Sequence, residues 1–221
     1  MFTKYGYSTI AVAAMIAFVL IGSGIWNSSV WPRYVLFALA ALVMIFTLQF
    51  FRDPERTPPA GNNILISPAD GKIIVIKEVD EPNFIKGKAT QISVFMSPLN
   101  VHVNRIPISG TVGYVKYIQG KFIAAFEDKA SSENERSEIG ISSPRGKIFF
   151  TQVAGFVARR IIYDLKEGDS VTIGKRFGMI KFGSRVDVIA PKEWVTNVKI
   201  GDVVTAGETV LFHYKEIEGI K

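Results

Sequence analysis

The sequence contains no cysteine, which excludes disulfides, thiol nucleophiles and cysteine-ligated metal sites. It has two histidines, His102 and His213, so imidazole chemistry has two candidates. A metal site built from several histidines is therefore not expected, and we predict that the protein binds no metal.

Acidic residues are missing from residues 1–51, where Lys4 and Arg33 are the charged side chains. Removing these two from the 26 basic residues leaves 24 against 20 acidic residues in 52–221, a net charge of +4. This balance suits an anionic membrane surface and is too weak to indicate nucleic acid, for which no motif is present.

Two uncharged apolar runs, residues 8–26 and 34–51, open the chain. Each has about 18 residues or more, and as a helix would span roughly 27 Å, close to the thickness of a bilayer's hydrocarbon core. Trp26 and Trp31 flank the short connection, and tryptophan favours the membrane interface. The pattern predicts a membrane anchor over 1–51 with two transmembrane helices. A cleaved signal peptide is the alternative for the first run, but a second span follows it closely.

Basic residues around the two runs predict the orientation. Lys4 precedes the first run, Arg52 and Arg56 follow the second, and Arg33 lies in the connection. The positive-inside rule then places both ends of the anchor in the cytoplasm. We expect a protein of the cell (inner) membrane whose main domain, residues 52–221, is cytoplasmic.

The pattern changes after three prolines within residues 54–59, which end any helix. Short apolar or alternating runs follow, separated by turn sequences such as PADG and PISG. The polar stretch 127–138 is expected to be a loop. We therefore predict a mainly β fold for 52–221, an antiparallel barrel or sandwich with few helices.

The Gly183-Ser184 dipeptide lies between two strand-like runs and offers one special reaction. Glycine has no Cβ, so a neighbouring hydroxyl can approach its carbonyl in a strained turn. The Ser184 hydroxyl would convert the amide to an ester, and β-elimination would expel the upstream chain and leave a group that hydrolyses to pyruvoyl. Most Gly-Ser dipeptides are ordinary turns, so this pair alone carries little weight.

Several separated motifs surround it, and together they resemble the phosphatidylserine decarboxylase proenzymes of the short, two-span bacterial and archaeal type. The resemblance covers nearly the whole chain. The motifs are FFRDPER at 50–56, SPADGKI at 67–73, NVHVNR at 100–105, NERSEIGI at 134–141, QVAGFVARRI at 152–161 and RFGMIKFGSRVD at 176–187.

The resemblance implies self-cleavage between Gly183 and Ser184 into a β chain, 1–183, and an α chain, 184–221, which stay associated. Residue 184 becomes the pyruvoyl group, the implied cofactor, and forms a Schiff base with the amine of phosphatidylserine. Decarboxylation then gives phosphatidylethanolamine, as in phospholipid biosynthesis. The pyruvoyl group is the electron sink here, as PLP is elsewhere.

Asp70 and His102 match family positions tied to an Asp-His-Ser relay, in which the carboxylate orients the imidazole. The sequence departs from the family pattern at Phe182 for Leu, at Arg185 for Thr, and at Arg105 where longer members have a second histidine. Arginine cannot act as a base near neutral pH. His102 therefore serves both maturation and decarboxylation, or the tasks are divided differently. Arg105 is the first candidate for binding the substrate's phosphate or carboxylate.

Other interpretations remain open at this point. Asp70 is also a good turn residue, His102 suits an ordinary strand, and His213 has no motif around it. The C-terminal segment 198–212 resembles a hairpin of lipoyl- and biotinyl-type domains, which makes a membrane-anchored carrier module modified on Lys181 the alternative function. A membrane serine hydrolase using Ser184, His102 and Asp70 is a third, although a Gly-x-Ser-x-Gly elbow is lacking.

Overall fold

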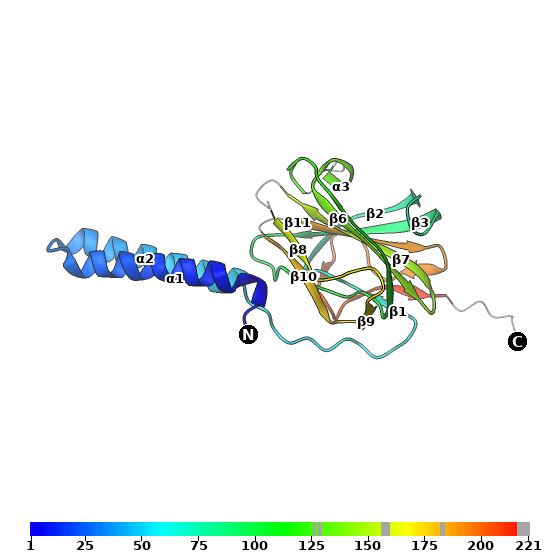
Figure 1. Cartoon of the computed structure of the whole chain (residues 1–221), viewed down its shortest axis with the longest axis horizontal. Helices are drawn as coiled ribbons and strands as arrows, with labels where there is room; N and C mark the ends of the chain where they lie inside the picture. Colours follow the sequence, from blue (N-terminus) through cyan, green and yellow to red (C-terminus); the bar gives the residue numbers. More distant parts are fainter. Residues whose placement is uncertain (126, 128–129, 156–159, 182–183, 216–221) are drawn as a thin grey trace, which may run out of the picture. The chain divides into compact units, whose positions relative to one another are not determined.

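The computed structural model describes residues 1–125, 127, 130–155, 160–181 and 184–215. The chain divides into two compact units, Met1–Glu55 and Arg56–Lys221. The first is helical, and the second is built mostly from strands (Figure 1). The prediction of a mainly antiparallel β fold preceded by two apolar helices is confirmed.

The helical unit consists of a 3-10 turn, η1 (Lys4–Gly6), and two long helices, α1 (Tyr7–Trp26) and α2 (Val30–Phe50). Helix α2 begins before the apolar run because Pro32 fits the first turn of a helix, where its missing N–H is not needed. Arg33 is also accommodated, because its Nη2 donates to the Asn27 carbonyl at 2.8 Å.

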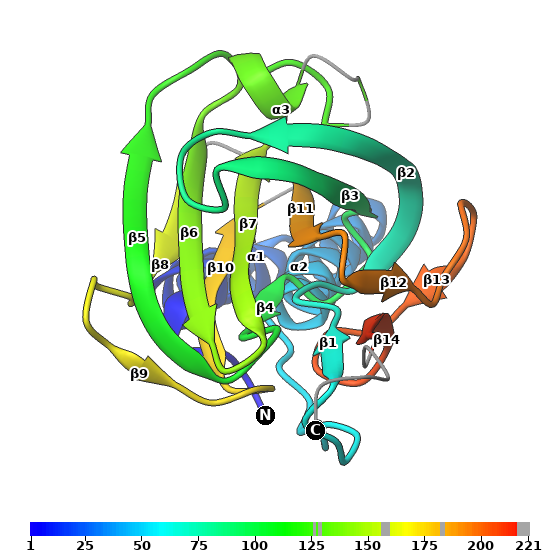
Figure 2. The same ribbon diagram turned by 90° about the vertical axis from the view of Figure 1, so that its right-hand side faces the viewer.

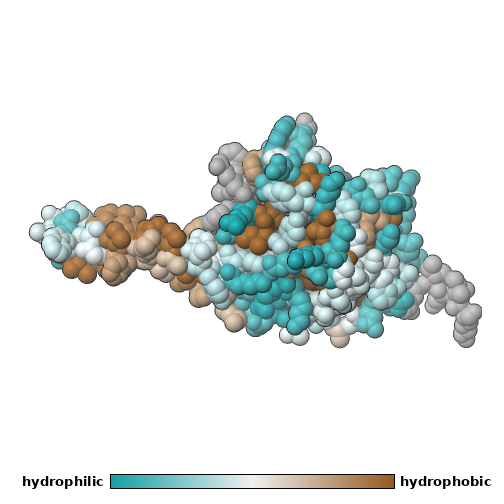
Figure 3. Space-filling view, viewed as in Figure 1, coloured by the Kyte–Doolittle hydropathy of each residue, from teal (hydrophilic) through white to brown (hydrophobic). Residues whose placement is uncertain are grey.

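Small side chains let α1 and α2 pack closely. Ala13, Ala17 and Ala40 are buried, and a Cβ added at Gly24 would lie 2.6 Å from the Phe37 ring. Many large apolar side chains, such as those of Phe18, Ile25 and Ile45, point outward instead, so the surface of the hairpin is hydrophobic (Figure 3). Both helices are long and apolar enough to cross a membrane.

The second unit contains three antiparallel sheets. The largest has the strand order β13-β2-β3-β11-β7-β6-β5-β9, and the others have the orders β4-β10-β8 and β1-β14-β12. Figure 2 shows the large sheet strongly curled. The elements are β1 (Ile64–Ile66), β2 (Gly71–Glu81), β3 (Gly87–Met96), β4 (Val103–Arg105), β5 (Gly110–Ile118), α3 (Ala130–Glu133), β6 (Arg136–Ser143), β7 (Gly146–Ala154), β8 (Arg160–Tyr163), β9 (Ser170–Val171), β10 (Arg176–Lys181), β11 (Ser184–Pro191), β12 (Trp194–Thr196), β13 (Val203–Val204) and β14 (Val210–Tyr214).

One hydrophobic core joins the three sheets. Alternate residues of the large sheet point into it, as Val186 and Val188 of β11 do, because side chains alternate between the faces of a strand. Phe150 of β7 meets Phe177 of β10 with ring centroids 5.4 Å apart, and Phe212 of β14 joins from the third sheet. The fold therefore places the end of β10 and the start of β11 against the same interior.

Gly71, the first residue of β2, tests how tightly this sheet is packed. A Cβ there would lie 2.1 Å from the Phe95 carbonyl oxygen, which belongs to the neighbouring backbone and cannot swing aside. We expect Gly71→Ala to lower the free energy of unfolding by about 2 kcal/mol. The measurement is the thermal unfolding midpoint of the detergent-solubilised protein.

The matched control is Gly87→Ala, at the first residue of β3, where an added Cβ meets nothing within 4 Å. That variant should unfold like the parent protein, within about 0.5 kcal/mol. Equal stability of the two variants would contradict the close approach at Gly71.

Candidate active site

Ser184 is the first residue of β11 and is fully buried. It lies between two strands, opposite Met96 of β3 on one side and Ala154 of β7 on the other. Its Oγ donates to the Met96 Sδ at 3.3 Å, a weak acceptor. Gly183 and Phe182, on the upstream side of the predicted cleavage site, lie outside the described residues.

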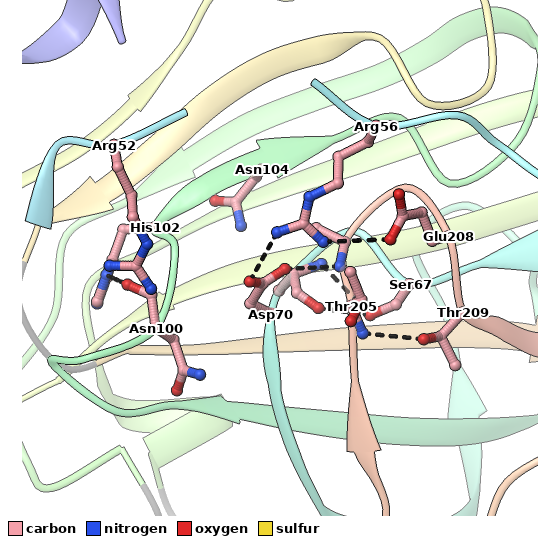
Figure 4. Close-up of polar contacts among 12 residues, drawn as sticks. Arg52, Arg56, Ser67, Asp70, Asn100, His102, Asn104, Thr205, Glu208 and Thr209 are labelled. Carbon is pink, nitrogen blue, oxygen red and sulfur yellow. Dashed lines mark hydrogen bonds and ion pairs between the residues drawn. The ribbon is translucent and has the colours of Figure 1, made fainter. Parts of the chain in front are cut away.

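His102 is buried and immediately precedes β4, which pairs with β10. Its carbonyl accepts the Ile180 N–H at 3.4 Å, one residue before Lys181 ends β10. The His102 backbone therefore lies beside the end of β10, the strand that precedes the Gly183-Ser184 bond in the sequence. Its Nδ1 lies 2.9 Å from the Asn100 carbonyl oxygen (Figure 4), so Nδ1 is the donor and the lone pair that can accept a proton is on Nε2.

Asp70 is bound on both carboxylate oxygens. Oδ2 accepts Arg56 Nη2 at 3.0 Å, and Oδ1 accepts the Ala206 N–H at 2.8 Å (Figure 4). Arg56 also lies 3.6 Å from Glu208. Within the described part of the chain, the Asp70 carboxylate is therefore oriented by Arg56 and Ala206 and is not bound to His102. The relay expected from the resemblance would require a further contact between Asp70 and His102, for which the carboxylate still has acceptor sites.

Arg105, the last residue of β4, is buried between two turns. Its Nη1 donates to the Gly174 carbonyl at 3.0 Å, and a Cβ added at Gly207 would lie 2.8 Å from its Cδ. Both glycines have left-handed backbone, with φ of 79° and 80°, which side-chain-bearing residues rarely adopt. Gly207 thus leaves room for the Arg105 side chain, while the Gly174 carbonyl fixes its guanidinium.

Asn104 lies at the centre of a buried hydrogen-bond chain. Its Nδ2 donates to the Pro68 carbonyl at 3.3 Å, and its Oδ1 accepts Gln152 Nε2 at 2.8 Å. Gln152 in turn accepts from Ser137 at 2.7 Å. Asn104 Nδ2 also lies 3.9 Å from the same Met96 sulfur that Ser184 contacts. One interior chain therefore connects β6, β7 and β4 with the turn before β2 and reaches the serine.

Lys181, at the end of β10, pairs across the ladder with Arg160 of β8. Burial and, second, the nearby Arg160 guanidinium lower the pKa of Lys181. Two cationic side chains thus lie on adjacent strands just before the predicted cleavage site. Their positive charges suit an anionic ligand. Both residues are also regular members of the paired strands β10 and β8.

Sequence reasoning missed Arg56, Met96, Asn104 and Gln152 as site residues. Three of them, Arg56, Asn104 and Gln152, lie inside the quoted motifs FFRDPER, NVHVNR and QVAGFVARRI, so the motifs carried a signal for them. Met96 had no such signal, because it ends an ordinary apolar strand. Its role depends on the register that sets it opposite Ser184.

The fold and this arrangement define a β-sheet domain built around a buried strand-end serine. A sequence model of the phosphatidylserine decarboxylase family matches residues 43–212. Three similar proteins are phosphatidylserine decarboxylase proenzymes, from Chlorobium limicola, Chlorobaculum tepidum and Salinibacter ruber, each 47% identical to this chain. The aligned regions cover 97%, 94% and 87% of this chain and 100%, 95% and 86% of the respective relatives.

The chain therefore belongs to the phosphatidylserine decarboxylase family, and the resemblance seen in its motifs is confirmed. This assignment accounts for nearly the full length. It favours the decarboxylase expectation over the carrier module and the serine hydrolase, each of which rested on a small part of the sequence.

Removing the Asn104 amide should destabilise the domain strongly. Asn104→Ala leaves the buried Gln152 amide without this acceptor and the Pro68 carbonyl with the Arg105 N–H as its remaining donor. We expect the free energy of unfolding to fall by about 2 kcal/mol or more. The measurement is denaturant unfolding in a Ser184→Ala background, so that chain cleavage does not affect the comparison.

Asn197→Ala is the matched control, because Asn197 Nδ2 also donates to a backbone carbonyl, that of Val210, but is exposed. Its effect should stay within about 0.5 kcal/mol. The central position assigned to Asn104 would be refuted if both variants unfolded at the same denaturant concentration.

Proposed function

We propose that this protein is a self-processing, pyruvoyl-dependent phosphatidylserine decarboxylase that converts phosphatidylserine to phosphatidylethanolamine. The observation that supports this most is the combination of a near full-length family match with the position of Ser184. Ser184 is the first residue of a central strand, and its buried hydroxyl donates to Met96. It directly follows the peptide bond that it is proposed to attack. Activation would come from cleavage of that bond.

The maturation reaction uses atoms of the chain and one water. The Ser184 Oγ adds to the Gly183 carbonyl carbon and the C–N bond breaks, so the amide becomes an ester and residue 184 gains a free amine. Loss of the Ser184 Cα proton expels the Gly183 carboxylate and forms a carbon–carbon double bond. Tautomerisation to the imine and hydrolysis release ammonia and leave the pyruvoyl group on the α chain.

His102 is the proposed base for these proton transfers, because its Nε2 carries the lone pair when Nδ1 donates to Asn100. Asp70 is proposed to contribute a negative charge to the site, which its ion pair with Arg56 partly neutralises. Arg105 is the proposed cationic contact for the substrate; since it is buried, the headgroup would need to enter beside the end of β4.

The surroundings of Ser184 fit a pyruvoyl group. Met96, Ala154 and Val186 are fully buried around it and give it apolar surroundings. The group supplies a ketone that captures the substrate amine and accepts the electrons released when CO₂ leaves. The task of the neighbouring side chains is to hold the headgroup and to deliver a proton to the reacting carbon in place of water.

The α chain is proposed to stay associated after cleavage. Strand β11 is hydrogen-bonded to β3 on one side and β7 on the other, and β14 lies between β1 and β12. Every strand of the described residues 184–215, except β12, therefore pairs with a strand from 1–183, and several pairs would have to break together for the chains to separate.

The two apolar helices are proposed as the membrane anchor of residues 1–51, with the decarboxylase domain, residues 52–221, on the cytoplasmic face of the inner membrane. Their exposed surface is apolar over lengths sufficient to span a bilayer. The basic residues at both ends of the hairpin agree with this orientation. An anchored enzyme meets its lipid substrate at the interface without extracting it from the bilayer.

Intact-mass analysis of the purified protein tests the proposed cleavage. We expect two chains, 1–183 and 184–221, with the α chain lighter by one ammonia than a serine-terminated peptide. Ser184→Ala removes the nucleophile and the leaving oxygen, so it should remain one chain and produce no CO₂ from phosphatidylserine in mixed micelles. An uncut wild-type chain that is active would refute the proposal.

His102→Gln tests the proposed base. Without an imidazole, cleavage should slow by about a hundredfold. His213→Gln is the control, because it changes the remaining histidine at an exposed position of β14 and should leave cleavage unchanged. The appearance of the α chain after translation into nanodiscs gives both rates, and wild-type kinetics in His102→Gln would exclude this role.

A further inference from the structure

The outer face of β11 carries two buried charges that the proposed mechanism does not use. Ser184 and Val186 point inward to the core, whereas Arg185 and Asp187 point to the opposite face. There the Arg185 side chain is fully buried and that of Asp187 is 4% exposed. Burying charges is costly unless each is paired, so the surroundings of this pair are informative.

Each guanidinium nitrogen of Arg185 has its own acceptor. Nε donates to Asp187 Oδ1 at 2.6 Å, Nη2 to Ser93 Oγ at 2.8 Å, and Nη1 to the Glu127 carbonyl at 3.3 Å. Asp187 Oδ2 accepts Ser131 Oγ at 2.5 Å. The acceptors come from β11, β3 and the segment around α3, so the side chain is held from three directions.

We propose that Arg185 is a positioning residue that holds residue 184 in register before and after self-cleavage. This inference rests on the proposed function. Cutting the Gly183-Ser184 bond turns residue 184 from an internal residue into a chain end, and chain ends fray unless they are tied down. Arg185 is joined to residue 184 by the peptide bond that cleavage leaves intact. Its fixed position therefore holds the carbonyl end of residue 184.

The same restraint acts on the proposed ester. Elimination requires the Cα–H bond of residue 184 to stay aligned with the base while the ester oxygen leaves. If residue 184 moves, water can instead hydrolyse the ester, adding across its acyl–oxygen bond to give the Gly183 carboxylate and an α chain that begins with an intact serine. Arg185 thus favours the pyruvoyl product over the serine-terminated product.

A second ion pair on the same face provides a matched control. Arg136 and Glu138 of β6 are also two residues apart on one strand, 2.9 Å from each other, and lie in the same cross-strand rows as Arg185 and Asp187. They lie on β6, which β7 separates from β11, and Arg136 is bonded to Glu138 and to the Ser132 and Asn134 carbonyls. Loss of either pair perturbs the sheet, but loss of the first also releases residue 184.

The test compares Arg185→Gln with Arg136→Gln in the full chain, translated into nanodiscs. Intact mass at successive times gives the cleavage rate and the share of α chain that begins with pyruvoyl or with serine. We expect Arg185→Gln to cleave about tenfold more slowly or worse and to yield more serine-terminated α chain. Arg136→Gln should cleave normally and give pyruvoyl only.

Arg185→Lys and Ser93→Ala keep the proposal testable if Arg185→Gln does not fold. Lysine retains the charge but lacks the planar fork, and Ser93→Ala removes one of the three contacts, so both should show smaller shifts in the same direction. Wild-type rates and products in all three variants would overturn the proposal. So would an Arg136→Gln variant that has the same unfolding midpoint as Arg185→Gln and cleaves equally slowly. An uncut wild type would instead overturn the proposed function.

Discussion

The arrangement of the candidate site depends on the hydrogen bonds of one buried side-chain amide, that of Asn104. Asn104, Gln152 and Ser137 have no exposed surface, so each of their polar groups must find a partner within the protein. Their hydrogen bonds run from β6 through β7 and β4 to the Pro68 carbonyl in the turn before β2. Four sequence motifs that are far apart in the chain meet along this path, which fixes the two smaller structures, β4 and the turn, against the large sheet.

The rest of the site follows from that arrangement. The Pro68 turn presents Asp70 to Arg56 and to the Ala206 N–H. Arg105 ends β4 directly after Asn104, and His102 immediately precedes the strand. Met96, which touches the Asn104 amide, is also the residue that faces Ser184 across β3 and β11. The serine is thus placed by strand register, while the histidine is placed by the strand that pairs with β10.

The sequence predicted the helices and the β domain well, but it predicted the contacts between side chains poorly. Alternating apolar residues and turn sequences predicted the β domain, and the apolar runs predicted the two helices, because periodicity and composition are local properties. The pairing of Asp70 with Arg56 was not foreseen, because it joins residues 14 positions apart through a turn geometry that sequence spacing does not encode. Likewise, Arg185 was noted as a departure from the family pattern, but its burial beneath the segment around α3 depends on tertiary packing.

The central position of β11 has a consequence for the stability of the mature protein. Before cleavage, unfolding is a reaction of one chain, and refolding does not depend on concentration. After the cleavage proposed above, the same sheet would be an assembly of two chains, so its reassembly would become second order and slow on dilution. The long chain provides the neighbours of β11 on both sides, and these neighbours would be left with open strand edges. The lifetime of the active enzyme is therefore governed by its unfolding rate rather than by a reversible equilibrium.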